Sequence, residues 1–120
     1  MKDEFKSLKI WQKAFEITKD IYELSKSFPK EEIYSMTSQI RRSAISVPSN
    51  IAEGCGYQSN AQLLKFLSIA LGSLYELECQ LLLSAELKLS DEKEIKNLLI
   101  KIEDEKRMLL GFAKSVRNRN

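Results

Sequence analysis

The side chains able to do chemistry are few, and their spacing argues against an active site. The chain of 120 residues contains no histidine, and its two cysteines are Cys55 and Cys79. General acid–base catalysis needs an acid and a base held together, and a zinc site needs several cysteine or histidine ligands. Glu76 and Glu78 are two residues apart and would diverge on a helix, while Glu53 with Glu76 would lack a polarising partner. We therefore expect no enzyme activity, no metal and no cofactor.

The two cysteines are interpreted as structural. Cys55 and Cys79 could pair, but disulfides are rare in cytosolic proteins, and an unpaired cysteine usually behaves as a small hydrophobic side chain. We expect both to be buried and reduced.

The segment Gln39–Gly54, QIRRSAISVPSNIAEG, combines adjacent arginines, small residues and an internal proline. Arg42, Ser46 and Asn50 are four residues apart, so a helix would place them on one face, with Gly54 next in line. The small residues would let a neighbouring helix approach closely. The segment is therefore predicted to be a helix that packs tightly on its neighbours and shows a charged edge.

The arginines of this segment have two interpretations. In the first, Arg41 or Arg42 pairs with Glu53 or Glu76 between helices, because an arginine at a helix interface usually has a carboxylate partner. In the second, the arginines contact phosphate, which suits the planar guanidinium group. We favour the first interpretation. The residues predicted to be structural or to lie at interfaces are Arg41, Arg42, Ser46, Pro48, Asn50, Glu53, Gly54 and Glu76.

Basic side chains gather near both ends of the sequence. No acidic residue follows Glu105, and lysines recur every three or four residues near the start, which places them on one helix face. These early lysines are Lys2, Lys6, Lys9 and Lys13. A solvated helix face and a frayed tail would give the same pattern, and we favour that simpler explanation. If a nucleic-acid-binding set exists, it is Lys6, Lys9, Lys13, Lys106, Arg107, Lys114, Arg117 and Arg119.

The elements that would position these residues are helices. Only two prolines and four glycines interrupt the chain, and apolar residues recur with a helical period. A first helix is predicted over Leu8–Phe28, where Pro29 ends it. Its apolar stripe is predicted to contain Trp11, Ala14, Phe15, Thr18, Ile21, Tyr22, Ser25 and Phe28.

A second helix is predicted over about Glu31–Gly54, with Pro48 inside it. A proline removes the hydrogen bond to the carbonyl four residues earlier, so we expect a kinked helix. The alternative is a restart, with Asn50 as the capping residue and Glu53 three residues later.

The third and fourth helices have recognisable starts. Ser59 with Gln62 three residues later forms a capping box, and Ser90 followed by DEKE is predicted to cap the last helix. The third helix carries an unbroken heptad, Leu63, Leu67, Ala70, Leu74, Leu77 and Leu81, beside a second row, Leu64, Leu71, Tyr75 and Leu82. This apolar surface is wider than one seam needs, so the helix is either the central one or also faces another subunit. The fourth helix carries the stripe Ile95, Leu98, Ile102, Leu109, Phe112 and Val116.

The fold predicted from these elements is all-α, a single domain of residues 1–120 forming an antiparallel, up-down-up-down four-helix bundle. Apolar residues make up 43% of the chain and charged residues 30%, which is typical of a folded protein. No apolar run approaches the roughly 18 residues of a membrane span. The charged opening MKDEFKS does not fit a signal peptide. We expect a cytoplasmic protein with no membrane partner.

Three stretches carry a resemblance: Leu8, Trp11 and Ala14, then QIRRSAISVPSNIAEG, then FLSIALGSLYELECQL from Phe66 to Leu81. On these, the chain resembles the four-helix-bundle family named for proteins encoded in intervening sequences of bacterial 23S ribosomal RNA genes. The resemblance implies a left-handed antiparallel bundle assembled as a homopentameric ring around a central channel, with no enzyme activity. The family is also similar to the accessory protein of diversity-generating retroelements, a basic pentamer that works with a reverse transcriptase and nucleic acid.

The function predicted from these observations is a non-enzymatic, oligomeric helical scaffold that binds structured RNA or other nucleic acid. The net charge of +2 alone implies no such affinity. A ring would multiply that charge and concentrate the basic tails, giving salt-dependent, sequence-tolerant binding. The alternative is an adaptor that contacts an unidentified protein partner and binds no nucleic acid.

Overall fold

Four long helices and two short 3-10 turns account for most of residues 4–119, the part of the chain that the computed structural model describes. In chain order the elements are η1 Phe5–Ser7, α1 Lys9–Ser25, η2 Lys30–Glu32, α2 Met36–Cys55, α3 Asn60–Glu86 and α4 Glu92–Arg117. The described residues contain no strand. The predictions of an all-α chain and of four helices are therefore confirmed.

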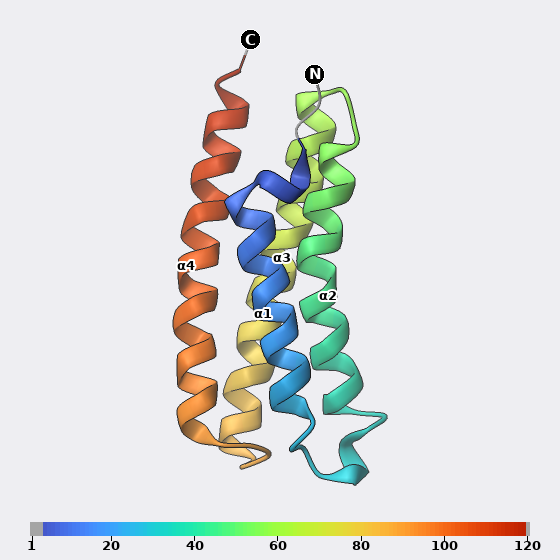
Figure 1. Ribbon diagram of the computed structural model, residues 1–120, viewed down its shortest axis with the longest axis vertical. Coiled ribbons are helices and arrows are strands. Elements are labelled where there is room, and N and C mark those ends of the chain that lie inside the picture. The colour runs from blue at the N-terminus through green and yellow to red at the C-terminus, as the bar shows by residue number, and fades with distance from the viewer. Residues whose placement is uncertain (1–3, 120) are drawn as a thin grey trace.

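The four α-helices lie side by side along the long axis of a molecule that measures 49 × 23 × 20 Å (Figure 1). The α1–α2 and α3–α4 connections lie at one end, and the α2–α3 turn lies at the opposite end together with η1 and the end of α4. Within the described range, α1 and α3 each pack against both α2 and α4, whereas neither diagonal pair makes close contact. All four helices therefore surround one core.

The buried face of α1 differs from the predicted stripe. Phe15 is 45% exposed and Tyr22 is 36% exposed, although both were expected in the core. The side chains of this region that enter the core are Ile10, Ala14, Ile17, Ile21, Leu24 and Phe28. Both sets follow helical spacing, so periodicity alone could not separate them. The aliphatic set fills the core, and Phe15 and Tyr22 lie on the side of α1 that faces α2.

The helix α2 begins later than predicted but continues through its proline. Its first residue is Met36 instead of Glu31, because the chain after Pro29 first forms the 3-10 turn η2. The carboxylate of Glu32 accepts a hydrogen bond from the backbone N–H of Met36 at 3.3 Å, which helps start the helix. Pro48 lies inside a continuous helix, so the alternative of a restart at Asn50 is wrong.

A side chain from α1 satisfies the backbone group that Pro48 leaves without a partner. Proline has no N–H, so the carbonyl of Ala44 loses its intrahelical hydrogen bond. The hydroxyl of Thr18 lies 3.0 Å from that carbonyl oxygen and 2.9 Å from the carbonyl oxygen of Ala14, so its single proton is shared between the two acceptors. Because a buried carbonyl without a donor is unfavourable, this contact fixes how α1 lies against α2.

The starts of α3 and α4 follow the predicted chemistry, with one shift. The hydroxyl of Ser59 accepts from the backbone N–H of Gln62 at 3.1 Å, which confirms the predicted cap of α3. For α4 the capping residue is Asp91, whose carboxylate accepts from the N–H of Lys93. The predicted cap Ser90 is therefore wrong by one residue. Its hydroxyl instead lies 2.6 Å from the hydroxyl of Ser27, across the end of the bundle.

The helix α3 supplies the largest share of the apolar core. Its predicted heptad, Leu63, Leu67, Ala70, Leu74, Leu77 and Leu81, is buried at every position. Among the described helices, α3 also has the length and composition that a membrane span requires. A segment this apolar was not expected from the sequence. The buried heptad accounts for part of this composition, and exposed apolar side chains such as Ile69, Leu82 and Leu83 account for the rest.

The contact between Thr18 and the Ala44 carbonyl can be tested by a double-mutant cycle with Pro48. We expect Thr18→Val to lower the free energy of unfolding by about 1 kcal/mol in the natural background. In a Pro48→Ala background the decrease should be much smaller, because an alanine at this position would supply the missing N–H. Urea titration of the four proteins measures both differences.

Thr37→Val is a matched control for this cycle, since Thr37 is buried but makes no such contact with Ala44. Its effect on the free energy of unfolding should be the same with and without Pro48. Equal effects of Thr18→Val in both backgrounds would contradict this account of Pro48.

Candidate nucleic-acid interface

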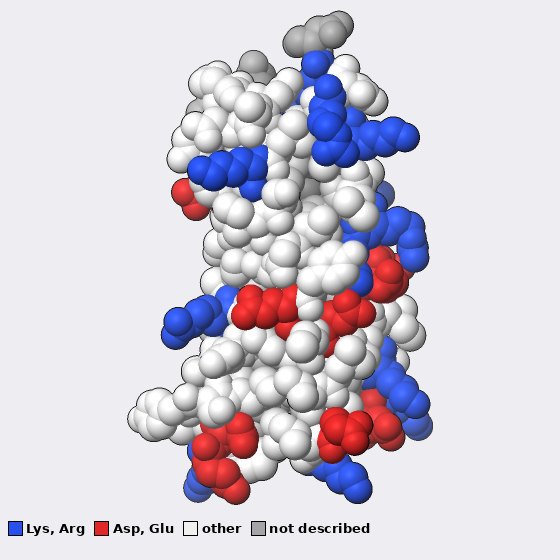
Figure 2. Space-filling view, turned by 180° about the vertical axis from the view of Figure 1, so that it is seen from behind, with Lys and Arg blue, Asp and Glu red and all other residues white. Residues whose placement is uncertain are grey.

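Four cations of the predicted basic set are exposed and unpaired. Lys6 and Lys9 come from η1 and the start of α1, and Lys114 and Arg117 come from the last turns of α4. Within residues 4–119, none of these four charged groups has a carboxylate partner. They lie at the end of the bundle where the α2–α3 turn is found (Figure 1). From behind, basic side chains appear at this end, while most acidic ones lie in the middle and at the opposite end (Figure 2).

The short turn η1 is held in place beside these cations. The side-chain amide of Gln12 donates to the carbonyl oxygen of Lys6 at 2.9 Å, and the ring of Phe5 lies edge-on to Trp11 with centroids 5.2 Å apart. Lys9 also borders a groove of about 530 Å³ between α1 and α4, together with Lys101. These contacts hold η1 against α1, so Lys6 and Lys9 project from defined secondary structure.

Two further members of the set have different surroundings. Lys13 is half-buried and borders the same groove. The guanidinium of Arg119 lies 5.8 Å from the centre of the Phe112 ring. The early lysine Lys2 lies outside the described residues.

Lys106 and Arg107 do not belong with this surface. The ammonium of Lys106 contacts the carboxylates of Glu78 at 2.9 Å and Glu103 at 3.1 Å, and only 8% of its side chain is exposed. It also lies 4.3 Å from the centre of the Tyr75 ring. The hydrogen bond to Glu78 is the main reason why the pKa of Lys106 is raised. Arg107 pairs with Asp104 at 3.0 Å. Lys106 therefore joins α3 to α4 and is not available to a ligand.

The adjacent arginines of α2 do not form the predicted ion pairs. The Nε of Arg41 donates to the hydroxyl of Ser25 at 2.7 Å, and its guanidinium lies 4.7 Å from the centre of the Tyr22 ring. Arg42 is exposed and has no partner in the described part of the chain. Neither arginine contacts Glu53 or Glu76, so the network expected between them is wrong. Arg41 instead links α2 to α1.

Small polar residues join α2 to α3, as the spacing predicted. The hydroxyls of Ser46 and Ser73 are 2.7 Å apart, and the side-chain amide of Asn50 donates to the carbonyl oxygen of Ser46 at 2.7 Å. A Cβ atom on Gly54 would lie 2.9 Å from the Cβ of Phe66, so only glycine fits this approach. Glu76 borders a groove of about 580 Å³ here, and its carboxylate has no partner among the described residues.

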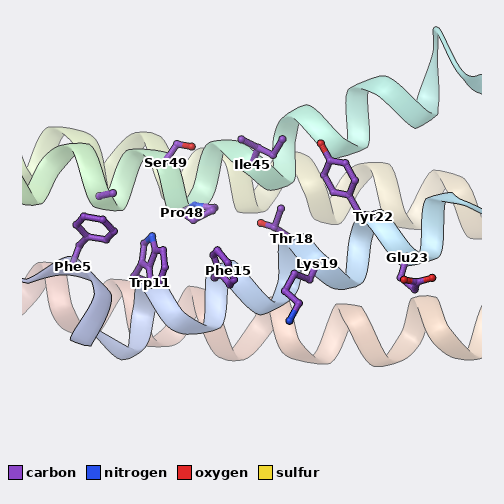
Figure 3. A pocket seen from close by; sticks show the side chains of 11 residues that line it. Phe5, Trp11, Phe15, Thr18, Lys19, Tyr22, Glu23, Ile45, Pro48 and Ser49 are labelled. Carbon is purple, nitrogen blue, oxygen red and sulfur yellow. The ribbon is translucent and has the colours of Figure 1, made fainter.

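A further groove, between α1 and α2, is mostly apolar and has a volume of about 590 Å³. We call it the aromatic groove. Phe5, Trp11 and Phe15 stand along it opposite Pro48 (Figure 3), and the Trp11 and Phe15 ring centroids are 4.9 Å apart. The other residues that line it are Thr18, Lys19, Tyr22, Glu23, Ile45, Ser49 and Ala52.

Neither cysteine takes part in a disulfide in the described structure. Cys55 is buried as predicted, but Cys79 is exposed, so the prediction was wrong for Cys79. Residues 4–119 contain no group of three histidine, cysteine, aspartate or glutamate side chains able to hold a metal.

The most unusual polar group is Glu105, which is fully buried among the apolar residues of α4. Neither of its carboxylate oxygens has a hydrogen-bond partner in the described structure. Burial raises the pKa of Glu105 to about 8, and the nearby Lys13 ammonium opposes this shift only in part. Sequence reasoning missed Glu105, although its position between Ile102 and Leu109 continues the apolar stripe of α4.

Comparison with known proteins gives a family and a similar structure. The model of the family described as "23S rRNA-intervening sequence protein" matches residues 6–111. A crystal structure of a protein of unknown function from the S23 ribosomal protein family of Bacteroides thetaiotaomicron is 26% identical, with a TM-score of 0.81. That similarity covers 88% of this chain and 95% of the other. No match is found among curated proteins.

The buried carboxyl of Glu105 predicts a specific pH dependence of stability. Below about pH 4.5 both states hold the proton; as the pH rises toward 8, only the unfolded chain releases it, so the folded state loses stability. The decrease is on the order of 5 kcal/mol and levels off above pH 8, where the folded state also ionises. We expect Glu105→Gln to remove most of this decline, as measured by urea unfolding from about pH 4.5 to 9.

Glu31→Gln, at an exposed carboxylate, is the control and should leave the decline unchanged. A variant at Glu105 that declines like the natural protein would show that Glu105 ionises freely when folded.

Proposed function

The chain belongs to the family of 23S rRNA-intervening sequence proteins, and we propose that it is a non-enzymatic, oligomeric helical scaffold that binds structured RNA or another nucleic acid. The observation that carries the proposal is the group of exposed, unpaired cations Lys6, Lys9, Lys114 and Arg117 at one end of the bundle. When unpaired surface cations neutralise phosphates, counterions that were bound to the nucleic acid are released. This release favours binding and needs no base-specific contacts.

The assembly belongs to the proposal. An up-down-up-down antiparallel order is supported by two connections at one end of the molecule and the third at the other (Figure 1). A homo-oligomeric ring would bring the same cations from every subunit to one side. Multiplying weak phosphate contacts in this way raises the overall affinity without any new contact type. The cytoplasm, where RNA and the proposed partners meet, is the compartment that fits this function.

The absence of catalysis is proposed from the chemistry of the polar groups. The sequence has no histidine. Glu105, whose pKa is raised to about 8, is enclosed in the core, and a general acid must reach its substrate. Glu53 and Glu76 are exposed, and neither borders an enclosed cavity with a base.

A protein-binding adaptor is the second candidate, favoured by the aromatic groove between α1 and α2. Exposed aromatic side chains are enriched in protein interfaces. In this case the groove would take a partner polypeptide and the cations would serve solubility only. The two candidates differ in their response to nucleic acid.

Charge reversal at the basic end tests the scaffold proposal. We expect Lys114→Glu with Arg117→Glu to weaken binding to a hairpin RNA at least about tenfold at roughly 50 mM salt, because two attractive interactions with phosphate become repulsive. Fluorescence anisotropy across a salt series would measure the affinity and its salt dependence. The slope of log K against log salt should fall by about 0.7 to 0.9 for each cation that no longer neutralises a phosphate.

Lys93→Glu with Lys96→Glu is the matched control, since both lysines are exposed at the other end of α4. It makes the same charge change and should leave binding close to that of the natural protein. If both double variants weaken RNA binding equally, the effect comes from the net charge alone and not from the position of the cations. Binding that is absent even at this low salt would remove the scaffold proposal and favour the adaptor.

A further inference from the structure

We propose that the aromatic groove of one subunit receives the outer face of α3 from a second copy of this chain, in a head-to-tail contact. The outer face of α3 is defined here as Ser68, Ile69, Gly72, Tyr75, Cys79, Leu82 and Leu83. This inference rests on the oligomer in the proposed function and identifies the two surfaces that build it.

The groove offers an apolar surface on which a second helix can pack. It runs along α1 and α2, and its walls are mostly apolar, with Phe5, Trp11 and Phe15 on one side and Pro48 on the other (Figure 3). Phe15 is 45% exposed, so the subunit alone leaves a large ring partly in water. Seating an amphipathic helix in such a groove is a common mode of recognition.

The outer face of α3 has the complementary character. Ile69, Tyr75, Leu82 and Leu83 are between 42% and 54% exposed, although each is large and apolar or aromatic. This face also contains Gly72, with no atom within 4 Å of the position that a Cβ would occupy. The missing side chain at Gly72 leaves room on this face for a second helix to approach closely.

The two surfaces match in height along the bundle. Thr18 contacts Ala44, and Ser46 contacts Ser73, so Thr18 and Ser73 lie at nearly the same level. In the up-down-up-down order proposed above, α1 and α3 run in the same direction. Copies placed side by side would then bring Phe15, one turn before Thr18, opposite the region of Gly72.

The charges at this level are also complementary. Lys19 lines the groove, and its contact with Glu16 at 3.6 Å is a highly exposed surface pair. Glu76 lies next to the outer face of α3 and has no partner among the residues that the structure describes. Lys19 follows Thr18, and Glu76 is three residues after Ser73, so the two charges would meet across the contact.

The contact must be head-to-tail because the two surfaces differ and face away from each other. The groove lies between α1 and α2, and α3 lies behind these two helices (Figure 1). A symmetric contact would place groove against groove, where neither copy offers a projecting helix. Each subunit in a head-to-tail contact keeps one surface free for the next, and such contacts close into rings when the rotation allows.

A disulfide between copies tests the pairing directly. Glu23 lines the groove five residues after Thr18, and the exposed Cys79 is six residues after Ser73, so the two should be neighbours across the contact. Oxidised Glu23→Cys should therefore give a ladder of linked subunits on a non-reducing gel. Adding Cys79→Ser should abolish the ladder. Dimers in the natural protein, linked through Cys79 alone, would overturn the proposal in favour of a symmetric α3–α3 contact.

A glycine pair gives a second test. Gly72→Leu should shift the mass in native mass spectrometry to that of the monomer while helix content and melting temperature are maintained. Gly111→Leu is the matched control, since Gly111 is also exposed within a helix and has open space at its Cβ position. It should leave the mass of the assembly unchanged. An assembly that survives Gly72→Leu would overturn the proposed surfaces.

The outcomes separate this inference from the proposed function. If the natural protein is a monomer in native mass spectrometry, both the oligomer and this contact are wrong. If it is an oligomer that gives no ladder with Glu23→Cys, the oligomer stands and the proposed surfaces are wrong. If the oligomer has the expected cross-links but binds no RNA, the contact stands and the nucleic-acid proposal is wrong.

Discussion

A proline in the middle of α2 obliges the bundle to supply a hydrogen-bond donor from another helix. The hydroxyl of Thr18 meets the Ala44 carbonyl that Pro48 leaves open, so α1 has one favourable register against α2. That register directs the aliphatic side of α1 into the core and leaves Phe15 and its aromatic neighbours on the side of α2. The groove along these two helices is therefore a consequence of how the core is assembled.

Helical periodicity located the elements well because the signal is repeated many times. The heptad of α3 and the capping role of Ser59 could be identified from spacing alone. The buried face of α1 could not, because two interleaved sets of residues have the same period and only packing decides which one is enclosed. The start of α2 could not be predicted either, because a 3-10 turn after Pro29 has no distinct pattern in the sequence.

Partners between helices were the least predictable feature of the candidate site. Arg41 was expected beside a carboxylate, but it meets a hydroxyl and a tyrosine ring because those groups lie at its height on α1. Lys106 was expected on the surface, but its ammonium group pairs with Glu78 of the adjoining helix α3, and its side chain is mostly buried. Such choices depend on the relative height and rotation of helices, which residue spacing within one helix does not contain. The exposed cations near the chain ends could be predicted without knowing how the helices are arranged.

The enclosed carboxyl of Glu105 changes what the protein presents to its surroundings. With its pKa raised to about 8, this group is mostly protonated at pH 7, so the folded chain is more positive than its formal charge of +2. Unfolding releases that proton and lowers the charge again. Folding and long-range attraction for polyanions are thereby coupled, since the native protein is more cationic than its amino-acid composition indicates.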